Sequence, residues 1–168
     1  MSFLPRVAYR VWQFLVALGA RPDSAGRKVV ASRLSTEQQR LFYSMTRRDQ
    51  RHCLDVYHAL CRQGCRDDDL LLAALLHDVG KGPVRLWHRV AYVLLKAASP
   101  RLVERAARSD GRGWRRAMAS LRHHAAEGAA LVEKAGAPAA VVELIRRHEA
   151  PGPADARLAL LRSVDEAC

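Results

Sequence analysis

The sequence predicts a single all-α domain, and three observations support this fold class. Its 168 residues are 49% hydrophobic but only 6% aromatic, a composition that favours helices over sheet. The seven prolines fall mostly at the edges of stretches with helical periodicity, where proline can begin or end a helix. The length suits one hydrophobic core and is short for two. We therefore expect one helical bundle with an N-terminal amphipathic helix.

The first expected element is an amphipathic helix over residues 3–18, followed by a loop over Arg21–Gly26 that contains Pro22. We expect residues 1–34 to pack on the domain, with attachment to a membrane surface as the alternative. The longest apolar run, residues 11–20, is too short to span a bilayer. Apolar side chains form one stripe of this helix at Leu4, Val7, Val11, Phe14, Leu15 and Leu18, with Arg6, Arg10 and Gln13 largely opposite.

Residues 35–168 form the predicted main domain. Capping residues at Ser35 and Thr36, and the acidic run Asp67–Asp69, mark two helix starts. The helix after Asp69 is apolar almost all round, so we expect it at the buried centre of the bundle. Start and stop signals predict helices over residues 36–45, 49–63, 70–79, 84–97, 101–108, 114–135, 139–149 and 154–166.

The formal charge of +11 would suit a polyanionic partner, but its distribution argues against a dedicated nucleic-acid reader. Lys and Arg are scattered and come only in pairs such as Arg47–Arg48, without basic blocks or interleaved aromatics. A phosphorylated small molecule is the better match. The four cysteines lack zinc-ribbon spacing, which favours reduced thiols and a cytoplasmic location.

The residues that carry chemistry centre on His77 and Asp78, at the end of the predicted central helix. A charged carboxylate in apolar surroundings costs several kcal/mol unless it is paired or bound to a metal. A lone buried histidine is more often a hydrogen-bonded core residue, but here other candidate ligands lie beside apolar stripes on separate helices. Imidazole and carboxylate together suit iron, manganese, zinc, cobalt or magnesium. These further candidates are His52, His124, His148 and Asp165.

Five segments in this order resemble the motif series of HD-domain phosphohydrolases, and the resemblance covers roughly residues 38–168. It implies a first metal held by His52, His77, Asp78 and Asp165. Asp78 would bridge to a second metal held also by His124 and His148, as in the binuclear branch of the superfamily. The segments are Arg51–Tyr57, Leu71–Lys81, His124–Ala129, Ile145–Glu149 and Leu161–Glu166.

That branch includes HD-GYP proteins and bacterial dinucleoside-polyphosphate hydrolases. The sequence after His148–Glu149 is Ala-Pro-Gly-Pro-Ala-Asp, without Gly-Tyr-Pro, so cyclic di-GMP hydrolysis is not supported.

Asp78 and Lys81 are the predicted catalytic residues. Two metals can bind phosphate oxygens, activate a water and steady the leaving oxygen, and the Lys81 ammonium would stabilise charge at the same place. The alternative for Lys81 is a solvated lysine at a helix end. Arg51 and the pair Arg146–Arg147 could also contact phosphate, but a solvated face is the preferred interpretation.

The remaining histidines are assigned by spacing. His124 is preferred to His123 because the segment from His124 to Ala129 matches the family motif. His58 is expected on the surface or behind a ligand, and His88 is expected to be exposed. Metal-bound imidazoles usually donate their other N–H to an acceptor, and Glu127 and Glu149 are the candidates.

The function implied is a metal-dependent phosphohydrolase that cleaves a phosphate ester or anhydride of a nucleotide-like small molecule, with one or two divalent metal ions. Two alternatives stay open at this point: an HD-type di-iron oxygenase, and a non-catalytic regulatory module that binds nucleotide or metal.

Overall fold

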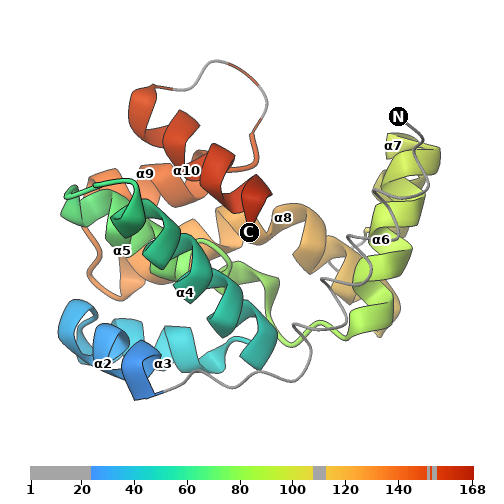
Figure 1. Ribbon diagram of the computed structural model, residues 1–168. Helices are drawn as coiled ribbons and strands as arrows, with labels where there is room; N and C mark the ends of the chain where they lie inside the picture. Colours follow the sequence, from blue (N-terminus) through green and yellow to red (C-terminus); the bar gives the residue numbers. More distant parts are fainter. Residues whose placement is uncertain (1–23, 108–112, 151, 153–154) are drawn as a thin grey trace.

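The computed structural model describes residues 24–107, 113–150, 152 and 155–168, and the regular secondary structure in these residues is entirely helical (Figure 1). This confirms the predicted all-α class. The predicted helix over residues 3–18 lies outside the described residues. The elements are α2 (Ser24–Arg33), α3 (Thr36–Ser44), α4 (Arg47–Arg62), α5 (Asp68–Leu76), the 3₁₀ helix η2 (Val79–Lys81), α6 (Leu86–Ala98), α7 (Pro100–Ala106), α8 (Trp114–Lys134), α9 (Ala139–Arg147) and α10 (Ala156–Ala167).

Helix α5 is the buried centre of the bundle, as its apolar sequence predicts. The Asp67 side chain caps it by accepting from the Leu70 N–H, and the acidic first turn complements the positive end of the helix dipole. The predicted end at Val79 is wrong. The helix ends at Leu76, and the backbone of Asp78 adopts φ −95° and ψ 0° before η2 begins.

The other helices surround α5. Helix α4 packs on one side and α9 on another, α8 packs against α9 and η2, and α10 contacts α4, α5 and α9. One hydrophobic cluster joins these elements, with Phe42, Leu60, Leu75, Ile145 and Leu161 fully buried in it. The ends of α5 and α9 therefore meet the middle of α8 inside the bundle.

Helix α2 shows where the sequence prediction was wrong. Residues 24–26 were expected in a loop because Pro22 and Gly26 are turn-forming residues, but the helix begins at Ser24 and includes Gly26. Val30 and Leu34 are buried in the main hydrophobic cluster, so the packing of these two side chains outweighs the weak amphipathic pattern of the segment.

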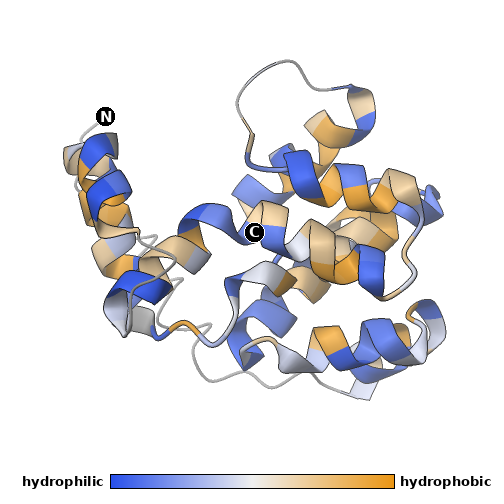
Figure 2. Cartoon of the chain, turned by 180° about the vertical axis from the view of Figure 1, so that it is seen from behind, coloured by the Kyte–Doolittle hydropathy of each residue, from blue (hydrophilic) through white to orange (hydrophobic). Residues whose placement is uncertain are grey.

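Helices α6 and α7, which we call the arm, stand apart from the main bundle and are joined to it through α8 (Figures 1 and 2). The arm has its own small core around Val84, Ala106, Met118 and Leu121. Among the described helices, none is both long enough and apolar enough to cross a membrane.

His88, on α6, was expected to be exposed and is buried. Its Nδ1 accepts a hydrogen bond from the Arg85 N–H at 3.2 Å. One residue further on, the Arg89 guanidinium forms a buried ion pair of 2.6 Å with Asp49 of α4. Arg89 therefore ties α6 to α4 of the main bundle.

Candidate metal centre

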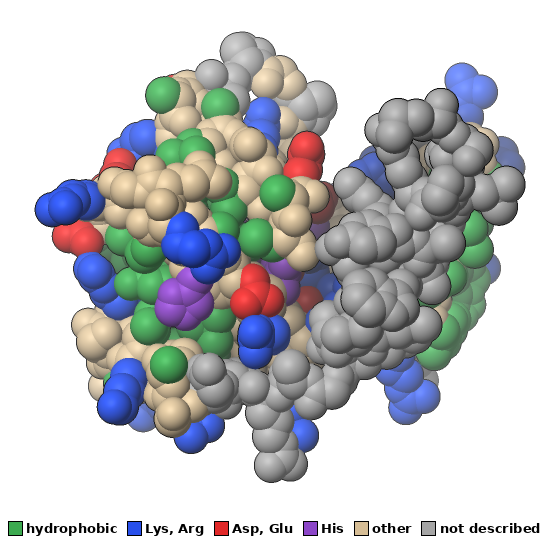
Figure 3. Space-filling model, in the orientation of Figure 1, with side chains coloured by type: hydrophobic (Ala, Val, Ile, Leu, Met, Phe, Trp, Pro, Cys, Tyr) green, Lys and Arg blue, Asp and Glu red, His purple; other side chains and the backbone are tan. Residues whose placement is uncertain are grey.

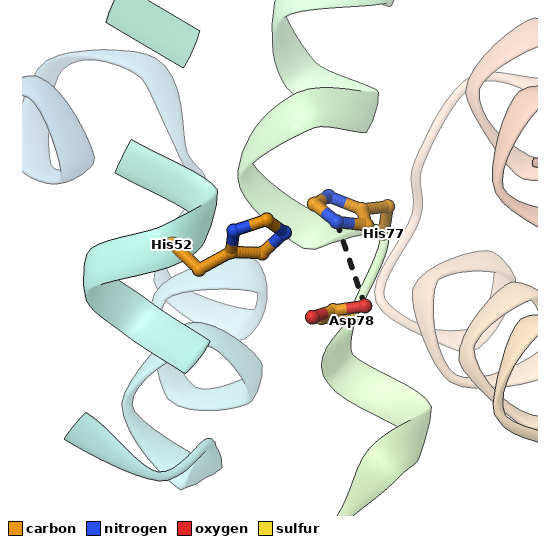
Figure 4. Close-up of side chains that lie close together, drawn as sticks. All are labelled: His52, His77 and Asp78. Atoms are coloured by element: carbon orange, nitrogen blue, oxygen red, sulfur yellow. Dashed lines mark ion pairs between the residues drawn. The ribbon is translucent and has the colours of Figure 1, made fainter. Parts of the chain in front are cut away.

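The six residues predicted as metal ligands come from five helices that meet at one place. His77 and His148 directly follow the last residues of α5 and α9 as their C-caps. His52 lies on α4, His124 in the middle of α8 and Asp165 on α10. Figure 4 shows His52 pointing from α4 toward His77 and Asp78. The structure thus brings together side chains that are up to 113 positions apart in the chain.

The first group of candidate ligands is His52, His77 and Asp78, with a ligand atom of each within 4.8 Å of the others. Asp165 joins them from α10. Its Oδ1 lies 2.7 Å from His52 Nε2 and 3.3 Å from His77 Nε2. His77 Nε2 also lies 3.4 Å from Asp78 Oδ1. Two imidazoles and two carboxylates therefore converge on one point.

The second group is Asp78, His124 and His148, again within 4.8 Å of one another. His124 Nε2 lies 3.3 Å from His148 Nε2 and 3.9 Å from Asp78 Oδ1. Asp78 belongs to both groups. The geometry is that of two adjoining three-ligand clusters that share one carboxylate.

The backbone orients three of the imidazoles. The Nδ1 atoms of His77, His124 and His148 lie 2.9, 2.9 and 2.7 Å from the carbonyl oxygens of the residues three positions earlier. A carbonyl can only accept, so each Nδ1 carries the proton and donates it. In the neutral ring, each Nε2 is then a bare lone pair that faces the centre of the cluster.

When the rings are neutral, this arrangement leaves acceptors facing acceptors. His77 Nε2 and Asp78 Oδ1 are buried and have no hydrogen-bond partner among the described residues. The Nε2 atoms of His124 and His148 face each other with no proton to share when both rings are neutral. Such contacts are repulsive unless a proton or a metal ion lies between the atoms. The donor set therefore fits a divalent metal, and histidine with carboxylate suits iron, manganese, cobalt, zinc or magnesium.

The electrostatics of the cluster follow from burial and from these neighbours. Burial alone would raise the pKa of Asp78, but Lys81 and the histidines lower it well below its usual range. Burial would lower the pKa of His77, but the Asp78 carboxylate raises it well above its usual range. Burial and the neighbouring His77 lower the pKa of His148 to about 3. His148 is therefore neutral near pH 7, the form in which imidazole binds a metal.

Lys81 lies beside the cluster and forms an ion pair with one of its members, Asp78. Its Nζ lies 2.6 Å from Asp78 Oδ2, and its side chain is only 19% exposed. The one-turn helix η2 creates this pairing, because it places the lysine three residues after the aspartate. The ammonium neutralises one oxygen of Asp78, and the other oxygen, Oδ1, faces the histidines.

Two glycines allow η2 to approach α8 closely. A Cβ on Gly80 would lie 2.1 Å from the His124 carbonyl oxygen and 2.5 Å from the Gly128 nitrogen. A Cβ on Gly128 would lie 3.2 Å from the Gly80 nitrogen. This backbone contact sets the separation between Asp78, just before η2, and His124 on α8.

Arg162 holds the end of α9, and nothing in so arginine-rich a sequence distinguishes it beforehand. Its guanidinium donates to the carbonyls of His148 at 3.0 Å and Arg147 at 2.7 Å. It also donates to the carbonyls of Ala150 and Gly152. These are carbonyls left free at the helix end, so Arg162 fixes the backbone that carries the His148 ring.

A cavity of about 340 Å³ adjoins the cluster, which is large enough for a small ligand. His148 and Asp165 belong to its wall, so it reaches the candidate ligands. Lys96 of the arm and Arg162 of α10 also line it. Glu149 and Glu166 line it as well, so the opening combines candidate metal ligands with side chains of both charges.

The remaining side chains that the sequence suggested for the site lie at its edge or on the surface. His123 is exposed whereas its neighbour His124 is buried. Glu127 is exposed, and Glu149 Oε1 lies 3.5 Å from His124 Nε2 rather than at Nδ1. The expectation that these glutamates orient the imidazoles was wrong, because backbone carbonyls do so. Arg51 pairs with Asp55 at 3.0 Å on the surface of α4.

Comparison with known proteins agrees with this geometry. The family model described as HD domain matches residues 50–168, which contain all six candidate ligands. No curated protein and no solved structure gave a significant match. The matched region is more than two thirds of the chain, and the protein belongs to the HD-domain family.

Proposed function

We propose that the protein is a metal-dependent phosphohydrolase that cleaves a phosphate ester or anhydride of a nucleotide-like small molecule. One observation carries the proposal: two clusters of imidazole and carboxylate ligands share the buried Asp78. Two adjoining metals that share a carboxylate are the arrangement that many phosphate-cleaving enzymes use. Membership of the HD-domain family supports a hydrolytic activity of this kind.

The proposed ligands divide into two sets. His52, His77, Asp78 and Asp165 would hold one divalent ion, and Asp78 with His124 and His148 would hold the other. When bound, such ions supply a Lewis acid for phosphate oxygens and a water of lowered pKa as nucleophile. The carbonyl bonds at Nδ1 keep three of the imidazoles in the tautomer that this role needs.

Two lysines would serve an anionic substrate at this site. Lys81 keeps Asp78 ionised by pairing with Oδ2, which suits a carboxylate that must bind cations. Lys96 lines the cavity together with Glu149 and Glu166, and its ammonium would bind phosphate beside His148. The cavity of about 340 Å³ is within the range that binds small metabolites, which supports a nucleotide-like substrate rather than a polymer.

The test is hydrolysis of p-nitrophenyl phosphate, bis-p-nitrophenyl phosphate, nucleoside triphosphates and a dinucleoside polyphosphate by protein loaded with manganese or iron. We expect turnover of at least one of these substrates. Asp78→Ala should abolish it, and His124→Ala should reduce it at least a hundredfold, in the range seen when a key catalytic group is removed.

The matched control is His123→Ala, which removes an exposed imidazole next to the proposed ligand and should leave turnover unchanged. A metal-loaded protein that turns over none of these substrates would contradict the proposal. Oxygen consumption by the iron-loaded protein would indicate oxygenase chemistry instead, because a hydrolase consumes none.

A further inference from the structure

The arm carries an exposed apolar surface that its own small core does not use. Helix α6 turns Ala91, Tyr92 and Leu95 toward that core. Its outer face presents Val93, which is 63% exposed, and Leu94, which is 64% exposed. A helix that is apolar on opposite faces is normally covered on both. Large exposed apolar side chains on the arm and the adjoining start of α8 are Trp87, Val90, Val93, Leu94, Leu102 and Trp114.

Basic side chains surround this surface. Residues 85–107 contain five Lys or Arg and one acidic residue, Glu104, which pairs with Arg122 of α8 at 3.0 Å. Figure 3 shows hydrophobic side chains along the right-hand edge of the molecule, with Lys or Arg side chains above and below them. The surface is thus apolar at its centre and positive at its rim. Exposed basic residues here are Arg85, Arg101, Arg105, Arg115 and Arg116.

We propose that the outer face of the arm binds the surface of a membrane that contains anionic phospholipids. Val93 and Leu94 would enter the boundary between headgroups and acyl chains, as the apolar face of an interfacial helix does. Trp87 and Trp114 are of the residue type that accumulates at this depth. The basic rim would contact the negatively charged headgroups.

The positive rim and the apolar centre of this surface together favour an anionic bilayer over other partners. A second copy of the chain would bring two basic rims together, which like-charge repulsion opposes. A nucleic acid would match the charge but not the exposed Val93 and Leu94, because it offers a phosphodiester surface. An anionic bilayer matches both properties.

The test is sedimentation of the full-length protein with vesicles of equal parts phosphatidylglycerol and phosphatidylcholine, compared with phosphatidylcholine alone. We expect binding to the anionic vesicles. The double variant Val93→Ser/Leu94→Gln should weaken it at least tenfold. The matched control Tyr43→Ser/Leu131→Gln removes two exposed apolar side chains elsewhere and should bind as the wild type does.

A second pair of variants, matched to each other in net charge, tests the basic rim. Arg101→Gln/Arg105→Gln should weaken binding about fivefold for each arginine removed. Arg62→Gln/Arg66→Gln makes the same change in charge at the C-terminal end of α4 and just after it, and should have a much smaller effect. Asp78→Ala should bind vesicles normally, so this proposal and the hydrolase proposal can fail separately.

Three results would overturn the proposal. One is a wild-type protein that does not sediment with anionic vesicles, and another is equal binding by the arm variants and their controls. The third is a concentration-dependent dimer that Val93→Ser/Leu94→Gln abolishes, which would make this face a contact between copies. If the wild type does not bind and the same variant lowers the melting temperature, residues 3–18 are the better candidate to cover the face.

Discussion

The Nε2 atoms of His124 and His148 lie 3.3 Å apart at the centre of the bundle. Both rings donate their Nδ1 proton to a carbonyl three residues earlier, so in the neutral rings these two Nε2 atoms face each other as lone pairs. Neither helix can move away freely, because α8 packs tightly on η2 and Arg162 holds the end of α9. The fold therefore holds two acceptor atoms close together, and a cation bound between them would turn their repulsion into attraction.

Removal of metal should lower stability. The metal-free protein retains the repulsion between acceptors, whereas a bound ion at a hundred times its dissociation constant adds about 2.7 kcal/mol. For a chain of this size we expect the melting temperature to fall by about 5 to 10 °C on treatment with a chelator. Differential scanning calorimetry of the chelated and reloaded protein measures it. Equal melting temperatures in both states would contradict a metal in this cluster.

Gly80→Ala should disrupt the contact between η2 and α8. The new methyl group would overlap the His124 carbonyl oxygen and the Gly128 nitrogen, so backbone must move, at a cost of about 3 kcal/mol. Chemical denaturation measures the loss, and bound metal should fall with it. In the control Gly136→Ala, Cβ has open space but φ is +74°, which costs about 1 to 2 kcal/mol. Equal costs would show that the close approach does not matter.

Arg162→Met should weaken metal binding without removing a ligand. The variant leaves the carbonyls of Arg147 and His148 without their donor, so the His148 ring loses its fixed position. We expect the affinity of the second metal to fall about 10- to 100-fold, and Arg162→Lys to recover part of it. Arg146→Met is the control, because Arg146 is exposed and pairs with Glu143 on its own helix. Titration with a competing chelator distinguishes these cases.

Two ion pairs should differ greatly in their contribution to the free energy of unfolding, because one is buried and the other is exposed. Arg89 and Asp49 are 14% and 3% exposed at the junction of α6 and α4, whereas Arg33 and Asp68 are 44% and 82% exposed. Arg89→Met leaves the buried Asp49 carboxylate with the Thr46 hydroxyl but without the guanidinium at 2.6 Å, and should cost about 3 kcal/mol. Arg33→Met should cost about 0 to 1 kcal/mol. Urea unfolding of both variants checks the contrast, and similar values would mean that the buried pair contributes little.

The sequence predicted the parts of this molecule that depend on local patterns. The apolar run of α5 and its Asp67 cap follow from local patterns, and both agree with the structure. The resemblance to the family motif selected His124 over His123 as a ligand, which stays a prediction, and His124 is the buried residue of the two. Each depends on residues close together in the chain.

The remaining features depend on tertiary packing. Helix α2 forms because Val30 reaches the core, although Gly26 suggests a turn. His88 is buried on the face of α6 that also carries Ala91, Tyr92 and Leu95, which pack on the small core of the arm. The carbonyls that orient the imidazoles belong to the backbone, which a search for acidic partners such as Glu127 could not find. The role of Arg162 depends on where α10 crosses the end of α9.

The central claim is that two metal sites share Asp78, and elemental analysis of purified, reloaded protein tests it most directly. We predict close to two equivalents of iron or manganese in the wild type and in His123→Ala. The double variant His124→Ala/His148→Ala should retain about one, and Asp78→Ala should retain little. A wild-type protein that cannot be loaded with metal, or a double variant that still holds two equivalents, would contradict the claim.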